Sequence, residues 1–442
     1  MTSPFARPIS APWRKSCFDQ EYSRGRARDV VESLGGARRA SVMAPPSNAL
    51  PSIEKQLLVC CARPNVQAPV AEKIRQLLNS PVDWDGLLSE AANHSVTPLL
   101  CRQLGTVGAD FLDAARLGQL QEAARGFALR NLVLSAELVK IMNVFQSEGL
   151  QAIPYKGPVL AVQVYGDVAL REFEDLDIIL RQQDVAKANK IMTQLGYSPK
   201  IPGIVSANAR LLAPGEYDYR DPSRRMMVEL HTERTLRHFP VPADIDDLAT
   251  RLVAVPVGGH DLETFSPEDT FLLLSIHGSK HFWERLCWIA DLAAFVQTYP
   301  RLDWDQVFRR AHLIRARRMV AVSLALVLHL FNPPHEVMAR VRRDTAANSI
   351  ARQIEHRLLA PSPGELGAAA RFHLRRQMLE GAFDGWRYSL RLATQPSDED
   401  WSAMPLPGVL APLYAALRPL RLLRKYRILG TGSSPGSMGS RN

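Results

Sequence analysis

The stretch that decides the fold is Gln151–Leu180, which reads QAIPYKGPVLAVQVYGDVALREFEDLDIIL. Its first part, Ala152–Tyr155, is a short apolar run typical of a strand. Gly157 lacks a Cβ and therefore permits a sharp turn. Pro158 then suits the first position of a helix, where its missing N–H costs nothing. The pattern predicts a strand, a tight turn and a helix that ends near residues 165–166.

The predicted start of this helix is suited to binding a phosphate. A helix presents free N–H groups and the positive end of its dipole at its first turn. Lys156 adds a mobile cation at the same place, and Gly157 would let the backbone approach the phosphate. We therefore predict that both residues contact the phosphates of a nucleotide.

A second predicted strand, Asp175–Leu180, follows the helix. Residues two apart on a strand share one face, so the side chains of Asp175 and Asp177 project together. Two neighbouring carboxylates repel each other unless a cation lies between them, and oxygen ligands suit Mg²⁺ or Mn²⁺. A phosphate-binding turn ahead of an Asp-x-Asp strand indicates metal-assisted phosphoryl or nucleotidyl transfer.

The same stretch resembles a known family. The residues that carry the resemblance are Lys156-Gly157, Tyr165-Gly166-Asp167, Arg171 and Asp175-Leu176-Asp177. They are similar to the signature of the uncharacterised bacterial nucleotidyltransferase-like proteins, which belong to the DNA polymerase β-type nucleotidyltransferase superfamily. The turn of that superfamily is usually Gly-Ser or Gly-Gly, whereas Lys-Gly stands here. The resemblance runs from about Ile53 to Tyr426, and it implies a nucleoside triphosphate partner and a site of three carboxylates that holds Mg²⁺ or Mn²⁺.

The third carboxylate is expected on the strand Met226–His231. Met227, Glu229 and His231 share one face of that strand. The resemblance implies that Glu229 is the third metal-binding carboxylate, although a lone glutamate on a strand is usually just solvated. His231 could line the same pocket, or be a half-buried histidine with a local hydrogen bond.

Two further cations are candidates for nucleotide binding. Arg171 could support the phosphates or pair with Asp175, and Lys280 could reach a triphosphate. Lys280 falls in a helix that is expected to begin at Ser266-Pro267, with serine as its cap and proline in its first turn.

His277 and His281 lie four residues apart on that helix and therefore on one face. This is a zinc-ligand spacing, but Gly278 stands where a zinc peptidase has its glutamate, and Asp291 is the one candidate for a third ligand. A packing or substrate-facing pair near the active site and ordinary helix chemistry are equally favoured, and both are favoured over zinc.

The composition is that of an ordinary globular protein of two or three structural units, with 442 residues, 46% hydrophobic and 22% charged. The net charge of +9 favours polyanionic partners. An odd number of cysteines, five, without a Cys-x-x-Cys pair argues against a disulfide framework or a zinc ribbon. No apolar run approaches the ~18 residues of a membrane span. We expect a cytoplasmic protein.

The expected fold is α+β, with a small mixed β-sheet nucleotidyltransferase core flanked by helical N- and C-terminal units. The predicted divisions are a disordered extension at residues 1–51, a helical unit at 52–129, the core at 130–260, a helical unit at 261–429 and a disordered tail at 430–442. Met43 is an alternative natural start, which would remove the first 42 residues.

The predicted function is transfer of a nucleoside monophosphate from an NTP to an unidentified acceptor hydroxyl on a protein, an RNA or a small molecule. Two alternatives stay open: a non-catalytic nucleotide- or RNA-binding protein that retains the fold, and an accessory protein of a polysaccharide or natural-product pathway. The basic and apolar stretch Leu417–Arg427 could make weak contact with an anionic membrane or nucleic acid, or simply close the fold as a packed helix.

Overall fold

The computed structural model describes five continuous stretches of the chain and a few positions beyond them. The stretches are residues 51–200, 215–221, 226–232, 245–360 and 366–394, and the further positions are 413, 416–419 and 421. The two predicted disordered ends, apart from Pro51, and most of the basic stretch Leu417–Arg427 lie outside these residues.

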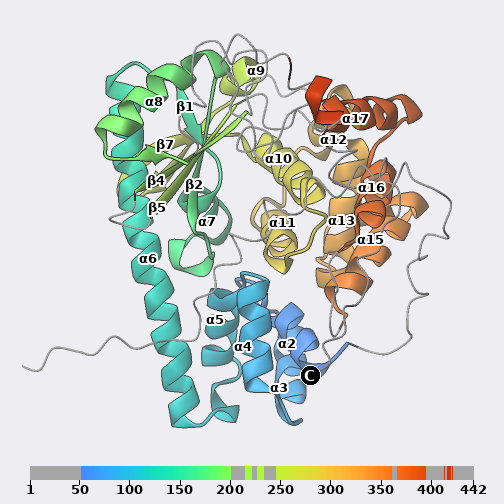
Figure 1. The fold of residues 1–442 in the computed structure, drawn as a ribbon. Coiled ribbons are helices and arrows are strands. Elements are labelled where there is room, and N and C mark those ends of the chain that lie inside the picture. The colour runs from blue at the N-terminus through green and yellow to red at the C-terminus, as the bar shows by residue number, and fades with distance from the viewer. Residues whose placement is uncertain are drawn as a thin grey trace, which may run out of the picture.

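The first part of the described chain is helical. Its helices are α2 (Ile53–Cys61), α3 (Ala68–Leu78), α4 (Trp84–Asn93), α5 (Thr97–Thr106), the 3₁₀ helix η1 (Ala109–Phe111) and α6 (Ala114–Ser147). Figure 1 shows that α6 passes the N-terminal helices at one end and runs beside the sheet at the other. Its buried residues near the second end, including Leu138 and Phe145, join the hydrophobic core under the sheet. The long helix therefore ties the two regions together.

The central sheet has five strands in the order β1-β2-β5-β4-β3. The strands are β1 (Ala152–Pro154), β2 (Asp175–Leu180), β3 (Ser198–Pro199), β4 (Glu216–Asp221) and β5 (Met226–His231). β2 and β5 are parallel, and the other neighbours are antiparallel. The helices between them are α7 (Gly157–Tyr165), η2 (Val168–Leu170), η3 (Gln182–Asp184) and α8 (Val185–Gln194). The α+β class with a small mixed sheet is confirmed, as are the predicted bounds of β2 and β5.

The two faces of the sheet differ because side chains alternate along each strand. On one face Leu176, Ile178, Val228 and Leu230 are fully buried against side chains of α6 and α8. The other face carries the acidic and imidazole side chains of the two central strands. Burial of the apolar face therefore fixes the direction in which the polar side chains of β2 and β5 point.

A second, two-stranded sheet was not predicted from the sequence. It consists of β6 (Val253–Val257) and β7 (His260–Thr264), joined by Gly258-Gly259 and preceded by the short helix α9 (Ile245–Ala249). A Gly-Gly pair between two alternating runs is a hairpin signal that was available in the sequence. Thr264 Oγ1 donates a hydrogen bond of 2.7 Å to the carbonyl of Pro154, which fastens the hairpin to β1.

The remaining described chain is helical. It comprises α10 (Pro267–Lys280), α11 (Leu286–Thr298), α12 (Trp304–Leu313), α13 (Arg317–Phe331), α14 (Val337–Arg342), α15 (Thr345–Leu358), α16 (Ala368–Met378) and α17 (Ala382–Thr394). As predicted, Ser266 caps α10, accepting a hydrogen bond from the N–H of Asp269. Figure 1 places α10 and α11 between the sheet and the outer helices.

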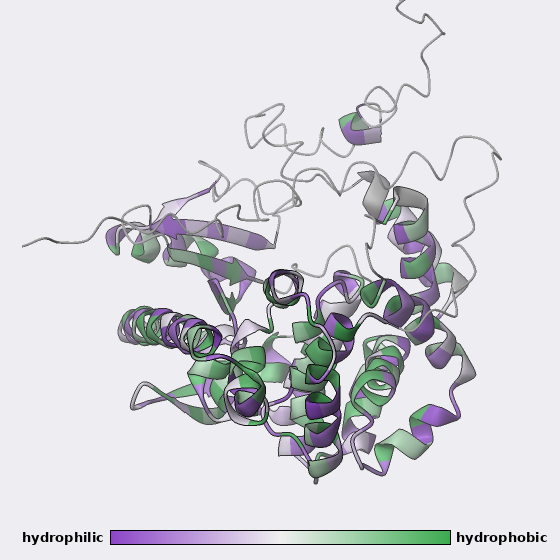
Figure 2. Cartoon of the chain, turned by 90° about the horizontal axis from the view of Figure 1, so that it is seen from below, coloured by the Kyte–Doolittle hydropathy of each residue, from purple (hydrophilic) through white to green (hydrophobic). Residues whose placement is uncertain are grey.

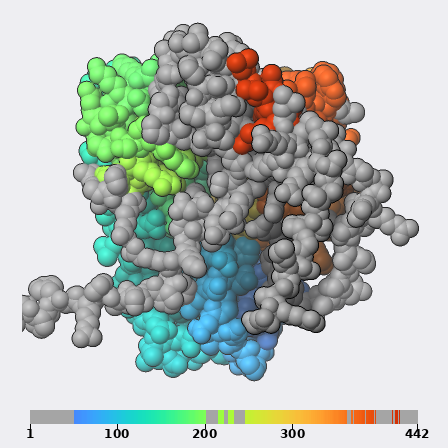
Figure 3. Space-filling view, in the orientation of Figure 1, coloured from blue at the N-terminus to red at the C-terminus, as the bar shows by residue number. Residues whose placement is uncertain are grey.

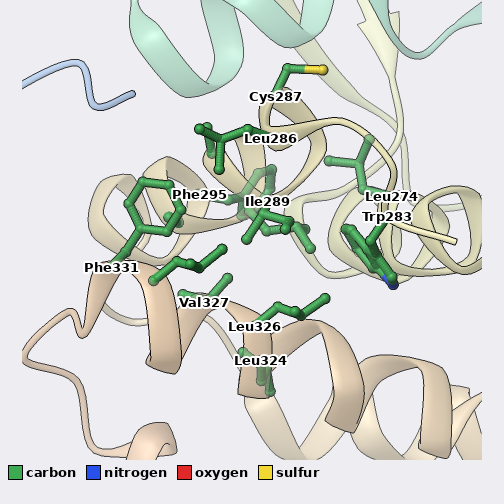
Figure 4. Close-up of a cluster of buried hydrophobic side chains, with 14 of the residues drawn as sticks. Leu274, Trp283, Leu286, Cys287, Ile289, Phe295, Leu324, Leu326, Val327 and Phe331 are labelled. Atoms are coloured by element: carbon green, nitrogen blue, oxygen red, sulfur yellow. The ribbon is translucent and has the colours of Figure 1, made fainter. Parts of the chain in front are cut away.

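The core of this helical region is built around α13, which is buried on nearly every side. Figure 4 shows side chains of α11, such as Ile289, directed toward Leu324 and Val327 of α13. Figure 2 shows hydrophobic stretches on the helices of the molecule, and in Figure 3 the N-terminal helices (blue) lie at the bottom, the region of the sheet (green) at the upper left and the C-terminal helices (orange to red) at the upper right. Within the described residues, no helix combines the length and hydrophobicity that crossing a bilayer requires. The division into domains stays a prediction.

One carboxyl in the loop before β2 gives a pH-dependent prediction. Burial, and then the charge of Glu174, raise the pKa of Glu172 to about 7. A raised pKa means that the folded state holds the proton more tightly than the unfolded state, so stability falls as the pH rises from the ordinary glutamate range through 7. Glu172→Gln should therefore raise the free energy of unfolding by about 1–3 kcal/mol at pH 8 and by much less at pH 5. Denaturant titrations at the two pH values measure this, and an equal change at both would contradict it.

Candidate functional site

The register of β2 against β5 brings the predicted acids together. Asp177 lies opposite Glu229, and Ile179 lies opposite His231. His231 Nε2 lies 2.9 Å from Asp177 Oδ1 and 3.4 Å from Glu229 Oε2. Each of the three offers a ligand atom, and these atoms lie within 4.8 Å of one another. Two strands that are distant in the sequence thus present two carboxylates and an imidazole at one place.

The turn before α7 supplies a cation to the same place. Lys156 Nζ lies 2.7 Å from Asp177 Oδ1, and both side chains are almost fully buried. Gly157 takes a positive φ of 52°, and a Cβ there would lie 3.4 Å from the carbonyl oxygen of Asp175. A glycine is therefore favoured where this turn passes the start of β2.

Tyr155 supports this arrangement. Its ring lies edge-on to the imidazole of His231 at 5.7 Å, and Lys156 Nζ lies 4.8 Å from the ring centroid. The ring of Phe265 also packs edge-on against Tyr155, with ring centroids 6.1 Å apart. Tyr155 is thus held in place beside both Lys156 and His231.

The pKa values of the site follow from burial and the surrounding charges. Burial would raise the pKa of Asp177, but Lys156 and His231 hold it well below its usual range. Burial, Asp177 and Glu229 raise the pKa of Asp175 well above its usual range, and burial also raises the pKa of Glu229. Burial would lower the pKa of His231, but hydrogen bonds with Asp177 and Glu229 outweigh it and raise that pKa to about 9. Of the three carboxyl groups, Asp177 is therefore the one whose negative charge Lys156 and His231 stabilise, whereas Asp175 and Glu229 hold their protons more tightly than free carboxyl groups do.

Asp175 is not part of the three-residue ligand group. It precedes Asp177 by two residues on β2 and lies opposite Met227 of β5, and the residue as a whole is less buried than Asp177. A role for Asp175 as a metal ligand stays a prediction.

Arg171 has a different partner from the two predicted for it. Its Nε lies 3.2 and 3.1 Å from the two carboxylate oxygens of Asp291 in α11, and Tyr165 donates a hydrogen bond of 2.8 Å to the same carboxylate. Arg171 and Asp291 are both buried. The guanidinium thus joins the loop before β2 to α11, while a phosphate contact of Arg171 and a zinc contact of Asp291 stay predictions.

His277 and Lys280 of α10, and His281 directly after it, lie at the margin of the site. Lys280 Nζ lies 3.3 Å from Glu216 Oε2, and Glu216 lies opposite His231 in the register of β4 and β5. His277 and His281 have ring centroids 4.7 Å apart, and the indole of Trp288 lies against both. Burial, and then the charges of Lys156, His281, Lys280 and His231, push the pKa of His277 well below its usual range.

The zinc reading of the histidine pair has no support in the described part of the chain. Neither His277 nor His281 belongs there to a group of three residues able to hold a metal. Both histidines pack on Trp288, and their place in the pocket and the phosphate role of Lys280 stay predictions.

No role was predicted from the sequence for Tyr155, Glu216 and Phe265, which surround the site, or for Asn131, which holds the loop before β2. Asn131 of α6 is fully buried and donates hydrogen bonds to the carbonyls of Val168 and Arg171, at 2.6 and 2.8 Å. In the sequence, Asn131 stands at helical spacing from the apolar residues Leu134 and Leu138. This spacing could have indicated a buried polar side chain.

A mixed sheet whose acidic face meets a glycine turn and the start of a helix defines a nucleotidyltransferase-like protein. The sequence comparison agrees: the model of a family described as "Uncharacterised nucleotidyltransferase" matches residues 80–332, more than half of the chain. The chain belongs to this family.

Other comparisons add little. A crystal structure of an antigenic nucleotidyltransferase-like protein from Paracoccidioides brasiliensis is similar at 12% identity and a TM-score of 0.27, over 45% of this chain and 91% of that one. A search of curated proteins found no match.

Proposed function

We propose that this protein transfers a nucleoside monophosphate from an NTP to an acceptor hydroxyl and releases pyrophosphate. The observation that carries the proposal is the pairing of Asp177 with Glu229 across β2 and β5, beside the turn that begins α7. Membership of a nucleotidyltransferase family supports it.

The two carboxylates suit a hard divalent cation, Mg²⁺ or Mn²⁺. Asp177 and Glu229 each offer a carboxylate oxygen close enough to the other for both to be ligands of one ion. When bound, such an ion would polarise the phosphoryl oxygens and lower the pKa of the attacking hydroxyl.

His231 fits a supporting role better than that of a metal ligand. A histidine that binds a metal almost always donates a hydrogen bond from its other ring nitrogen. Within the described residues, Nδ1 of His231 is buried and has no hydrogen-bond partner. We assign to His231 the orientation of Asp177 and Glu229, which its Nε2 contacts.

The remaining residues would bind and orient the nucleotide. Phosphate oxygens would approach the first N–H groups of α7, the helix that begins at Gly157. Lys280 would attract the triphosphate as a further cation. Its ammonium now pairs with Glu216, so it would have to leave this partner to reach a phosphate. We predict a cation-dependent binding mode in which the triphosphate lies along the start of α7.

The test is a screen of the full chain with the four NTPs, Mg²⁺ or Mn²⁺ and candidate acceptors. The expected result is pyrophosphate release that EDTA abolishes, with a mass gain of one nucleoside monophosphate on the acceptor. Nucleotide binding without release under any of these conditions would favour the non-catalytic binding protein instead.

A further inference from the structure

One carboxylate oxygen at the centre of the site already has two partners. Asp177 Oδ1 lies 2.7 Å from Lys156 Nζ and 2.9 Å from His231 Nε2. Lys156, Asp177 and His231 are 8%, 5% and 3% exposed, so solvent contributes little to neutralising them. Asp177 is also one of the three residues whose ligand atoms lie close enough together to hold a metal.

A divalent ion bound by Asp177 would compete with the ammonium of Lys156 for the carboxylate of Asp177. A metal–oxygen bond is about 2.0–2.1 Å long for Mg²⁺, so an ion on Oδ1 would lie within a few ångströms of Nζ. Two cations at that distance in a buried place repel strongly, because little water screens them.

The side chain of Lys156 can also move from Asp177 toward the start of α7. Its four-carbon side chain is flexible, and its backbone stands directly before α7, where a triphosphate would bind. The ring of Tyr155 lies along the ammonium and offers a second favourable contact during such a movement.

We propose that Lys156 is the resident counter-cation of Asp177 and exchanges with the divalent ion when a nucleoside triphosphate binds. The inference rests on the proposed function and adds regulation to the same site. Without nucleotide, the ammonium holds Asp177 and keeps metal affinity low. With nucleotide, the ammonium moves to the phosphates and the ion takes its place, so metal and nucleotide bind cooperatively.

The experiment is a titration of the nucleotide-free full chain with Mn²⁺ at neutral pH, in which electron paramagnetic resonance measures free Mn²⁺. Lys156→Met should bind Mn²⁺ at least about 10-fold more tightly than the parent, because the competitor is gone. Lys156→Gln, which keeps a hydrogen-bond donor for Asp177, should show the same direction and serves if the methionine variant does not fold. Lys140→Met removes a lysine from a pair with Glu137 on α6 and is the matched control, with no expected change.

The outcomes separate the two proposals. Equal or weaker Mn²⁺ binding in both Lys156 variants, with binding that still depends on Asp177, would overturn the exchange and leave the proposed function intact. No Mn²⁺ binding in the parent or in either variant, with an NTP absent or present, would overturn both. Tighter binding in the Lys156 variants that Asp177→Asn removes again would establish that the ammonium and the ion share one carboxylate.

Discussion

Asp177→Asn is expected to lower the rate of nucleotide transfer by about 10³-fold or more. A bound metal contributes several kcal/mol of charge stabilisation, and each 1.36 kcal/mol corresponds to about a factor of ten. The asparagine keeps the shape of the side chain but removes the charge that Lys156 and His231 face. Steady-state pyrophosphate release, measured at a temperature where circular dichroism shows the variant folded, tests this.

Asp269→Asn is the matched control for that loss. Asp269 is 1% exposed and its carboxylate also has two cationic partners, Arg251 and Arg310, but it lies at the start of α10. It should lower stability while leaving activity per folded molecule near that of the parent. Comparable activity losses in the two variants would mean that the effect of Asp177 is structural.

Asp291→Ala is expected to lower the free energy of unfolding by about 3–5 kcal/mol, the usual cost of leaving one member of a buried ion pair without its partner. Arg171 would remain buried without its partner, and the hydroxyl of Tyr165 would lose its acceptor as well. Denaturant titration measures the loss.

The control for this variant is Asp305→Ala, whose partner Arg340 is exposed. An exposed pair contributes only about 0–1 kcal/mol, so the change in unfolding free energy should be small. If Asp291→Ala kept its stability but lost nucleotide binding, Arg171 would be a phosphate contact as the sequence suggested, and the account of its pairing would be wrong.

The parts of the fold that the sequence predicted are those with local signals. Alternation in Met226–His231, and the apolar run with two acids in Asp175–Leu180, match the observed strands. Gly157 and Pro158 mark the start of α7, and Gly166 ends it in the left-handed conformation. Each of these features depends on residues within a few positions of one another.

The parts that were missed depend on contacts between distant residues. Arg171 meets Asp291 across 120 positions, and nothing near either residue distinguishes that pairing from a phosphate contact. The contact of Lys156 with Asp177 likewise required knowledge of how the turn lies on β2. Sequence reasoning could place the acids on strands, but the order β1-β2-β5-β4-β3 decides which cations reach them.

The most direct test of the central claim is a crystal structure of the full chain with Mn²⁺ and a non-hydrolysable NTP analogue, examined by anomalous scattering. The account predicts a manganese peak bonded to the carboxylates of Asp177 and Glu229, with the triphosphate at the start of α7 and Lys156 moved onto it. A nucleotide bound elsewhere, or Lys156 still on Asp177 with manganese absent from both carboxylates, would contradict it.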